Sequence, residues 1–437
     1  MTKQIVFAIA LIVTLGVFGF TIARIIRFFS LTRKGFPIKN LGKRFMLMLE
    51  IAFGQTKIFR RPVIGFFHAT VFWGFCIILF GSIEMVIDGL FKMEKSLSFL
   101  GWFYDFLMAS GDIFALLVAI SIVIFLIRRI FLHIKRFEGI EMKKISHVDA
   151  NVALTIILIL MISLMGMNAA YVSYTASTNG ELYGIYPVSQ HLTGLYSGMS
   201  IESTFVMYQV FWWTHILLIF VFANILPYSK HFHVFMSVPN TFISRLEPLG
   251  KLKNMDNVTR EVKLMMDPNA AFAAPATDAP IERFGVKDAE DVMWNNYFNS
   301  LSCTECGRCT SVCPANTTGK KLSPRKVMMD LRARMKEKGP QLLKNKDFND
   351  GKSLVRDYVS EEELWACTTC NACAKECPIN INQPSLIVDM RRYLVMEEGS
   401  APGEIKAMFN NIENNGAPWQ YSPEDRLLWT KDLEINV

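Results

Sequence analysis

The sequence predicts an all-α fold in two parts, a bundle of five membrane-spanning helices and a cysteine-rich helical part outside the membrane. The first observation is five apolar runs, each long enough to cross a hydrocarbon core, which needs about 20 residues. The second is that the chain after them lacks the alternating apolar and polar pattern of strands. Composition agrees, because 51% hydrophobic residues and a mean hydropathy of +0.26 are too apolar for a soluble protein of 437 residues.

The five runs occupy the N-terminal half, and the loops between them differ in charge. The runs are Ile5–Ala23, Val63–Met85, Phe103–Ile127, Val152–Tyr171 and Phe205–Pro227. The first lacks a small-residue cleavage site, so we expect a retained helix and not a signal peptide. Lysine and arginine crowd loops 24–61 and 128–144, whereas residues 172–204 contain neither. Because basic loops stay inside, we expect the N-terminus outside and the C-terminal half in the cytoplasm.

Histidines are the first chemical signal in the membrane part. His68 lies within the second run, His215 within the fifth, and His233 just past its cytoplasmic end. An unpaired imidazole in lipid is costly, which indicates a proton relay or a cofactor ligand. Two imidazoles on facing helices would both be satisfied as axial ligands of a b-type haem. On a continuous helix His215 and His233 lie about 27 Å apart, so they cannot bind the same iron.

A change in composition after Pro239 separates the membrane part from the rest. Residues 241–292 are polar and then rich in alanine and proline (DPNAAFAAPATDAP), which is typical of a linker. We therefore predict a membrane domain over 1–240, this linker, and a third domain over 293–437.

Three helices are predicted in the last domain. The first starts at Ser323, with Pro324 in its first turn, and ends at Gly339. The second follows Ser360, whose hydroxyl is placed to cap it. The third covers the run QPSLIVDMRRYLVMEEG. Together they predict a helical iron-binding domain and not a small β-rich one.

Eight of the nine cysteines form two copies of the pattern C-x2-C-x2-C-x3-C-P, the bacterial spacing for cubane clusters. In each copy the first three thiolates can wrap one cubane, and the fourth can reach the other cluster. We therefore predict two [4Fe–4S] ligand sets: Cys303, Cys306, Cys309 and Cys377, and Cys367, Cys370, Cys373 and Cys313. Zinc prefers two separated cysteine pairs, and structural disulfides are rare in the cytoplasm; clusters of purely structural role are the third alternative. Cys76, within the second apolar run, is expected to pack as a small apolar residue.

The run WWTHILLIFVFANILPYSKHFHVFMSVPN resembles the last transmembrane helix of the gamma subunit of respiratory nitrate reductase and of the membrane cytochrome b of heterodisulfide reductase. The resemblance implies a five-helix cytochrome b bundle with haem between the second and fifth helices. It implies that His68 and His233 ligate the haem nearer the cytoplasm and that His215 ligates a distal haem. The sequence departs from this pattern at Ile78, where a second distal ligand is expected. His191, in the outer loop, is the alternative ligand.

The runs LWACTTCNACAKECPININ and VDMRRYLV and the tail NNGAPWQYSPEDRLLW resemble the iron–sulfur domain of heterodisulfide reductase. The iron–sulfur subunits of anaerobic glycerol-3-phosphate dehydrogenase and succinate dehydrogenase are similar to a lesser degree. In many members this tail leads into a domain with CCG motifs that carries the thiol chemistry. No CCG sequence occurs here, so the resemblance implies a separate CCG subunit docked on a tail within 293–437.

Together these features predict an oxidoreductase subunit of a prokaryotic inner membrane. It would carry electrons between the (mena)quinone pool, as substrate, and a cytosolic CCG protein that serves a disulfide or an electron-transfer flavoprotein. Haem b and two [4Fe–4S] clusters would carry them, with no catalytic residue on this chain. No Walker or G-x-G-x-x-G motif occurs, and basic residues flank apolar runs, which argues against nucleic acid. A redox sensor or assembly scaffold is the alternative, and a proton pump using Glu84 and Asp112 is a third hypothesis.

Overall fold

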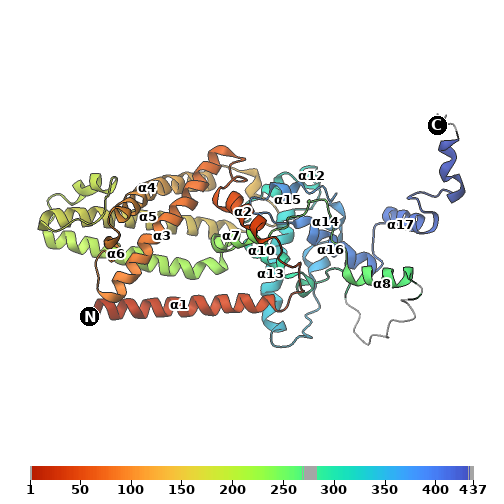
Figure 1. Cartoon of the computed structure of the whole chain (residues 1–437), viewed down its shortest axis with the longest axis horizontal. Helices are drawn as coiled ribbons and strands as arrows, with labels where there is room; N and C mark the ends of the chain where they lie inside the picture. Colours follow the sequence, from red (N-terminus) through yellow and green to blue (C-terminus); the bar gives the residue numbers. More distant parts are fainter. Residues whose placement is uncertain (1, 268, 270–282, 432, 434–437) are drawn as a thin grey trace.

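The computed structural model describes residues 2–267, 269, 283–431 and 433. Within these ranges the regular elements are all helical and no strand is formed, which confirms the predicted all-α class. Figure 1 shows an elongated molecule with long helices at one end and a group of shorter helices at the other. A C-terminal arm extends away from both.

The five predicted spans are confirmed as helices that are long and apolar enough to cross a membrane. They are α1 (Thr2–Phe29), α3 (Pro62–Phe91), α4 (Trp102–Ile130), α5 (Lys144–Thr178) and α6 (Ile201–Ile225). Large apolar side chains cover their outer faces, for example Phe20, which is 72% exposed, and Val63, which is 68% exposed. Lipid, and not water, favours such faces, so the chain is a multi-pass membrane protein.

Helix α1 connects the two ends of the molecule. It starts at the far end of the bundle and runs into the group of shorter helices (Figure 1). Its last turn packs there: Phe28 is buried against Gly339, and the Phe29 ring lies 4.9 Å from that of Tyr297. The end of α1 therefore belongs to the apolar core of the second part.

The fifth span does not continue to His233 as one helix. Helix α6 ends at Ile225, because Pro227 cannot continue the backbone hydrogen-bond ladder. Two short 3-10 turns follow, Leu226–Tyr228 and Lys230–Phe232. Helix α7 (His233–Ile243) then begins at the histidine itself. The separation of about 27 Å given above assumed a continuous helix between His215 and His233, which is not formed, and the break sets His233 at the junction of the two parts.

Short elements lie between the bundle and the second part. Helix α2 (Leu41–Met48) and a π turn over Leu49–Phe53 follow α1 and pack against α7. The basic loops 24–61 and 128–144 lie at this junction, whereas the N-terminus lies at the opposite end of the bundle (Figure 1). The charge asymmetry of the sequence thus corresponds to the two ends of the bundle.

The cysteine-rich module consists of short helices around one apolar core. They are α10 (Trp294–Ser302), α11 (Arg308–Ser311), α12 (Pro314–Thr317), α13 (Pro324–Leu342), α14 (Glu361–Ala366), α15 (Ala372–Glu376) and α16 (Gln383–Met396). The predicted caps are present: the Ser323 hydroxyl accepts from the Lys326 amide, and Ser360 forms a capping box with Glu363. Helix α13 extends three residues beyond the predicted end at Gly339.

The predicted linker is described only in part. It contains helix α8 (Asp256–Met266), whereas its alanine- and proline-rich run falls mostly on residues 268 and 270–282, outside the described residues. Residues 283–292 are packed into the module, where Val286, Ala289 and Val292 are buried. The module is followed by α17 (Gly403–Asn415) and a 3-10 segment over Pro423–Thr430, which together form the projecting arm.

Candidate functional site

The two cysteine blocks fold into matching loops. In each loop the residue two positions after the first cysteine and the residue directly after the second have positive φ. These are Glu305 and Gly307 at +57° and +73°, and Thr369 and Asn371 at +52° and +60°. Left-handed residues at matched positions wind the chain around its own thiols and aim backbone N–H groups inward. The Thr369 amide donates to the Cys367 sulfur at 3.4 Å, an interaction that tunes an iron–sulfur cluster.

The eight thiols gather in two sets, and each fourth cysteine lies with the other block. Electrostatic interactions of the Cys309 thiol are strongest with Cys306, Cys303 and Cys377, and then with Cys373. Those of the Cys373 thiol are with Cys367, Cys313 and Cys370. Across the described residues no three ligand-type side chains converge on a single ion, whereas a cubane offers a separate iron to each thiolate. The grouping fits the predicted ligand sets, whose assignment to clusters stays a prediction.

Burial makes the thiols harder to deprotonate, and bound iron would offset this cost. Burial raises the pKa of Cys303 to about 11 and the pKa values of Cys373 and Cys377 to about 12. A thiol binds iron only after losing its proton, so burying so many thiols together is useful chiefly when iron binds them. Cys370, in contrast, is exposed.

The loop that precedes α3 holds the first cysteine set. The Arg308 guanidinium donates from Nη1 to the Lys57 carbonyl at 2.8 Å and from Nη2 to the Ile58 carbonyl at 3.2 Å. In the other direction, Lys57 Nζ donates to the Cys377 carbonyl at 3.3 Å, and Arg60 donates to the Lys375 carbonyl at 2.7 Å. These contacts join the α11 and α15 loops of the module to the start of the second span.

The loop between α4 and α5 holds the same side of the module. Arg325 and Glu141 form a buried ion pair at 2.7 Å, with side chains 1% and 3% exposed. Arg325 also donates to the Arg136 carbonyl at 2.8 Å. Gly307, next to Cys306, approaches that carbonyl so closely that a side chain would not fit. The first cysteine set is therefore enclosed by loops of the bundle.

His68 and His233 are brought together at this junction. Helix α3 carries His68 in its second turn, and the ring lies within electrostatic reach of both His233 and Arg308. Its Nδ1 is buried with no hydrogen-bond partner in the described part of the chain. Buried polar atoms are normally hydrogen-bonded, so this atom is an exception with a cause to be found. His233 Nδ1 lies 3.2 Å from the Lys230 carbonyl, and burial lowers the pKa of His233. A neutral imidazole held by a carbonyl is the form that binds a metal, so these residues fit a haem iron.

His215 lies deeper in the bundle and is oriented in a similar way. Its Nδ1 is 3.0 Å from the Leu160 carbonyl and 3.0 Å from the Ser163 hydroxyl, and the residue is 2% exposed. This arrangement directs Nε2 away from the backbone as a metal-ligating histidine requires. Ile78 packs as an apolar residue beside this region, and His191 is exposed in the outer loop.

Sequence reasoning missed two residues of the junction. Arg308 was not predicted to be a site residue, although its position between two predicted cluster ligands places a basic side chain next to thiolates. His231 is the second: its ring centroid lies 6.0 Å from that of His233, and burial lowers its pKa to about 3. Glu84 and Asp112 have structural partners: Glu84 accepts from the Leu97 amide, and Asp112 from the Val188 and Ser189 amides.

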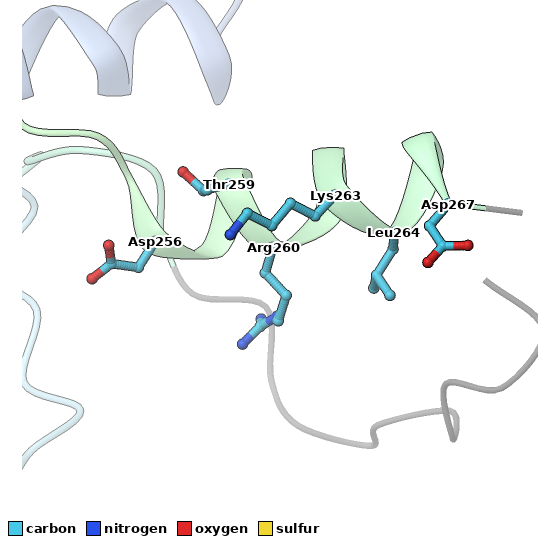
Figure 2. A pocket seen from close by; sticks show the side chains of 6 residues that line it. All are labelled: Asp256, Thr259, Arg260, Lys263, Leu264 and Asp267. Atoms are coloured by element: carbon cyan, nitrogen blue, oxygen red, sulfur yellow. The ribbon is translucent and has the colours of Figure 1, made fainter. Parts of the chain in front are cut away.

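A hollow on the linker helix contributes no site chemistry. Figure 2 shows its lining side chains, among them Arg260, Lys263 and Leu264, which come from α8 and from Asp267 directly after it. None of the lining residues is a cysteine or histidine. The chemistry of the described residues is thus concentrated at the junction of bundle and module.

Comparisons with known proteins agree with this chemistry. Residues 302–381 match the 4Fe-4S dicluster domain family. The chain is 28% identical to the probable iron-sulfur-binding oxidoreductase FadF of Bacillus subtilis, over 88% of this chain and 55% of that protein. It is 27% identical to the EtfAB:quinone oxidoreductase of Syntrophomonas wolfei, over 91% of this chain and 55% of that protein.

A third relative matches a shorter part of the chain. It is one of the subunits of the ferredoxin/F420H2-dependent CoB-CoM heterodisulfide reductase of Methanosarcina acetivorans, and it is 35% identical over 22% of this chain and 47% of its own length. The chain spans about half the length of the curated relatives it matches. No solved structure matches it. The similarity to iron–sulfur oxidoreductases and heterodisulfide reductase subunits supports an electron-transfer role.

Proposed function

We propose that this chain is a membrane subunit that carries electrons between the quinone pool and a cytosolic redox partner. The observation that carries the proposal is the bridge made by Arg308. Its side chain interacts with the thiols of Cys306 and Cys377, binds the loop before α3 and lies within electrostatic reach of His68. The first cysteine set and His68 are thereby held close to the same side chain.

The proposal assigns cofactors to the residues that the structure brings together. A b-type haem is held by His68 and His233, and His215 offers one ligand to a second, distal haem. Two [4Fe–4S] clusters are held by the thiol sets: Cys303, Cys306, Cys309 and Cys377, and Cys367, Cys370, Cys373 and Cys313. When bound, these groups take up and release single electrons. The chain itself supplies ligands, amide donors to sulfur, and a water-poor junction.

The domain division and orientation follow from the same features. We assign the haem bundle to 1–240, the linker to 241–292 and the iron–sulfur domain with its docking tail to 293–437. Loops 24–61 and 128–144, rich in lysine and arginine, lie at the end of the bundle that carries the module. Positively charged loops remain in the cytoplasm of a prokaryotic inner membrane, so the module belongs on that side.

The partner is proposed to carry the substrate chemistry. The relative from Syntrophomonas wolfei is named an EtfAB:quinone oxidoreductase, which favours an electron-transfer flavoprotein as the electron source and a quinone as the acceptor. The heterodisulfide reductase relative favours a CCG subunit between this chain and the substrate. The arm formed by α17 and the segment after it is the proposed docking tail.

Haem content tests the membrane half of the proposal. Purified protein is expected to have the α-band of a b-type cytochrome, about eight cluster irons, and one or two haems per chain. His68→Ala and His233→Ala should each remove one haem, because each deletes an axial ligand. His133→Ala is the control, since its side chain is 98% exposed. A protein without haem would contradict the proposal and favour a redox sensor or assembly scaffold.

Electron transfer tests the connection between the two halves. In membrane vesicles, a reduced menaquinone analogue should reduce haem and clusters in the unmodified chain. Cys306→Ser should leave haem reduction intact and suppress reduction of the clusters, because it alters a ligand on the junction side. Unchanged cluster reduction in this variant would contradict the proposed path.

A further inference from the structure

The two cysteine sets have different surroundings. Every contact described above between bundle loops and the module falls near the first set. Lys57 binds the Cys377 carbonyl, Arg308 binds the loop before α3, and Gly307 lies against the Arg136 carbonyl. Lys230 and Glu305 add an ion pair at 3.6 Å, with side chains 6% and 7% exposed. A protein partner cannot approach the first set from this side, because the bundle already covers it.

The second set reaches the surface of the module. Cys370 is exposed, and so is Thr368 before it, whereas Cys303, Cys309, Cys313, Cys373 and Cys377 are all buried. The exposed loop comes directly after α14, so its position is fixed by a capped helix. A redox group held at Cys370 would therefore lie close to a molecule docked on this face.

A hollow lies beside this loop. Its volume is about 500 Å³, and it is lined by Lys320 after α12, by residues of α14 that include Trp365, and by Ala401 and Pro402 just before α17. Trp365 Nε1 is buried without a hydrogen-bond partner in the described part of the chain, and the Arg391 guanidinium lies 4.9 Å from the Trp365 ring. The hollow thus presents the Trp365 ring with charged side chains at its edge, and aromatic residues are enriched at protein-binding surfaces.

We propose that the loop 367–371, with the hollow beside it, is the face on which a soluble redox protein docks. The inference rests on the proposed function and adds the order in which electrons pass through the two cysteine sets. The first set is internal and faces the histidine site, and the second is the exchange site. One electron passes between the partner's one-electron carrier and the iron held at Cys370, so one is oxidised as the other is reduced.

The arm supports the choice of occupant. It begins at Pro402, which lines the hollow, and extends away from the body of the molecule (Figure 1). Helix α17 buries none of its residues, and the arm exposes Trp419 and Trp429 at 62% and 68%. Aromatic side chains of this kind are enriched at protein interfaces. A soluble partner seated at Cys370 would lie within reach of them.

Spin relaxation of the two clusters tests the order without any partner or quinone. The full chain in detergent is reduced with dithionite, and electron paramagnetic resonance is recorded with and without a water-soluble dysprosium chelate. Cys370→Ser identifies the signal of the second cluster and Cys306→Ser that of the first. Cys76→Ser, at the cysteine outside both sets, should alter neither.

We expect the chelate to raise the half-saturation power of the signal altered by Cys370→Ser several-fold, with a much smaller change in the other signal. Equal changes, or a larger change in the signal altered by Cys306→Ser, would overturn the proposal. If Cys370→Ser loses its cluster, the signal that remains belongs to the first set, so the comparison still holds. Absence of haem would refute the proposed function but leave this measurement intact.

Discussion

Gly65 controls how closely the loop before α3 approaches the second span. It lies in the first turn of α3, and a Cβ placed on it would be 2.7 Å from the Ile58 carbonyl oxygen. Carbon–oxygen contacts in proteins are about 3.3–3.6 Å, so Gly65→Ala must move the loop by roughly 0.6 Å. The blocking atom belongs to the backbone, which cannot rotate away as a side chain can. Overpacking of this size costs about 1–3 kcal/mol.

The displacement has a specific chemical consequence. The Ile58 carbonyl accepts from Arg308 Nη2 at 3.2 Å, and a shift away from Arg308 would break that hydrogen bond. We expect Gly65→Ala to lower the apparent melting temperature of the purified protein. We also expect slower reduction of the clusters by a menaquinol analogue in vesicles, with haem content unchanged, because His68 stays on the same helix.

The matched control is Gly81→Ala in the same helix, where an added Cβ meets no atom within 4 Å. This substitution should cause no loss, since alanine is the better helix former. Equal melting temperatures and equal cluster reduction in the Gly65→Ala and Gly81→Ala proteins would refute the reasoning, because only the first change places a Cβ against the backbone of Ile58 and Phe59.

Three further changes test other parts of the structure. Arg308→Gln removes charged hydrogen bonds worth about 1.5–3 kcal/mol each, and should lower the melting temperature of the module without loss of haem. Ser163→Ala removes the hydroxyl beside His215 and should weaken any haem held there by about 10-fold, measured as haem per chain. Asp288→Asn should cost about 1.5–3 kcal/mol, measured by thermal loss of cluster absorbance, because Arg334 loses the charge of its buried partner and keeps only the ion pair with Asp350. Burial by itself raises the pKa of Asp288, but hydrogen bonds from Arg334 hold that pKa below its usual value. The difference in stability between the unmodified protein and the Asp288→Asn protein should therefore narrow only below about pH 4, where the carboxylate begins to be protonated.

Two of these predictions have a stated control or contrary outcome. The exposed ion pair between Lys352 and Glu337, at 3.8 Å with side chains 57% and 49% exposed, should contribute no more than about 1 kcal/mol. Lys352→Gln is therefore the control for Asp288→Asn, and similar losses in both would contradict a special role for burial. For Ser163→Ala, unchanged haem content would indicate that the Leu160 carbonyl alone orients His215.

Local signals made the helices predictable. Each span is an uninterrupted apolar run, and length alone distinguishes it from a core helix. Ser323 and Ser360 were predicted as caps because a hydroxyl acts within three residues of itself. The break after Ile225 was also encoded, by Pro227, but the apolar run through it concealed the change of direction. Sequence patterns thus predicted elements well and the path between them less well.

The junction could not be predicted in the same way. The hydrogen bond from Arg308 to the Lys57 carbonyl joins residues 251 positions apart, and no periodicity relates them. Cysteine spacing predicted the candidate cluster ligands, because ligand geometry within each block is local. It did not predict which cysteine set faces the bundle, because that depends on how the loops at 57–61 and 133–141 fold over the module.

The chemistry of the junction explains why it should be rigid. In addition to the apolar packing at the end of α1, buried charges join bundle and module, including Arg325 with Glu141 and Lys230 with Glu305. The desolvation cost of such pairs offsets most of their attraction, so they contribute little net stability. These ion pairs form in only one relative position of bundle and module, however, because any shift leaves a buried charge unpaired. An apolar interface of the same area would bind as well and slide more easily. Charged contacts of this kind suit a site in which the distance between His68 and the first cysteine set must stay constant.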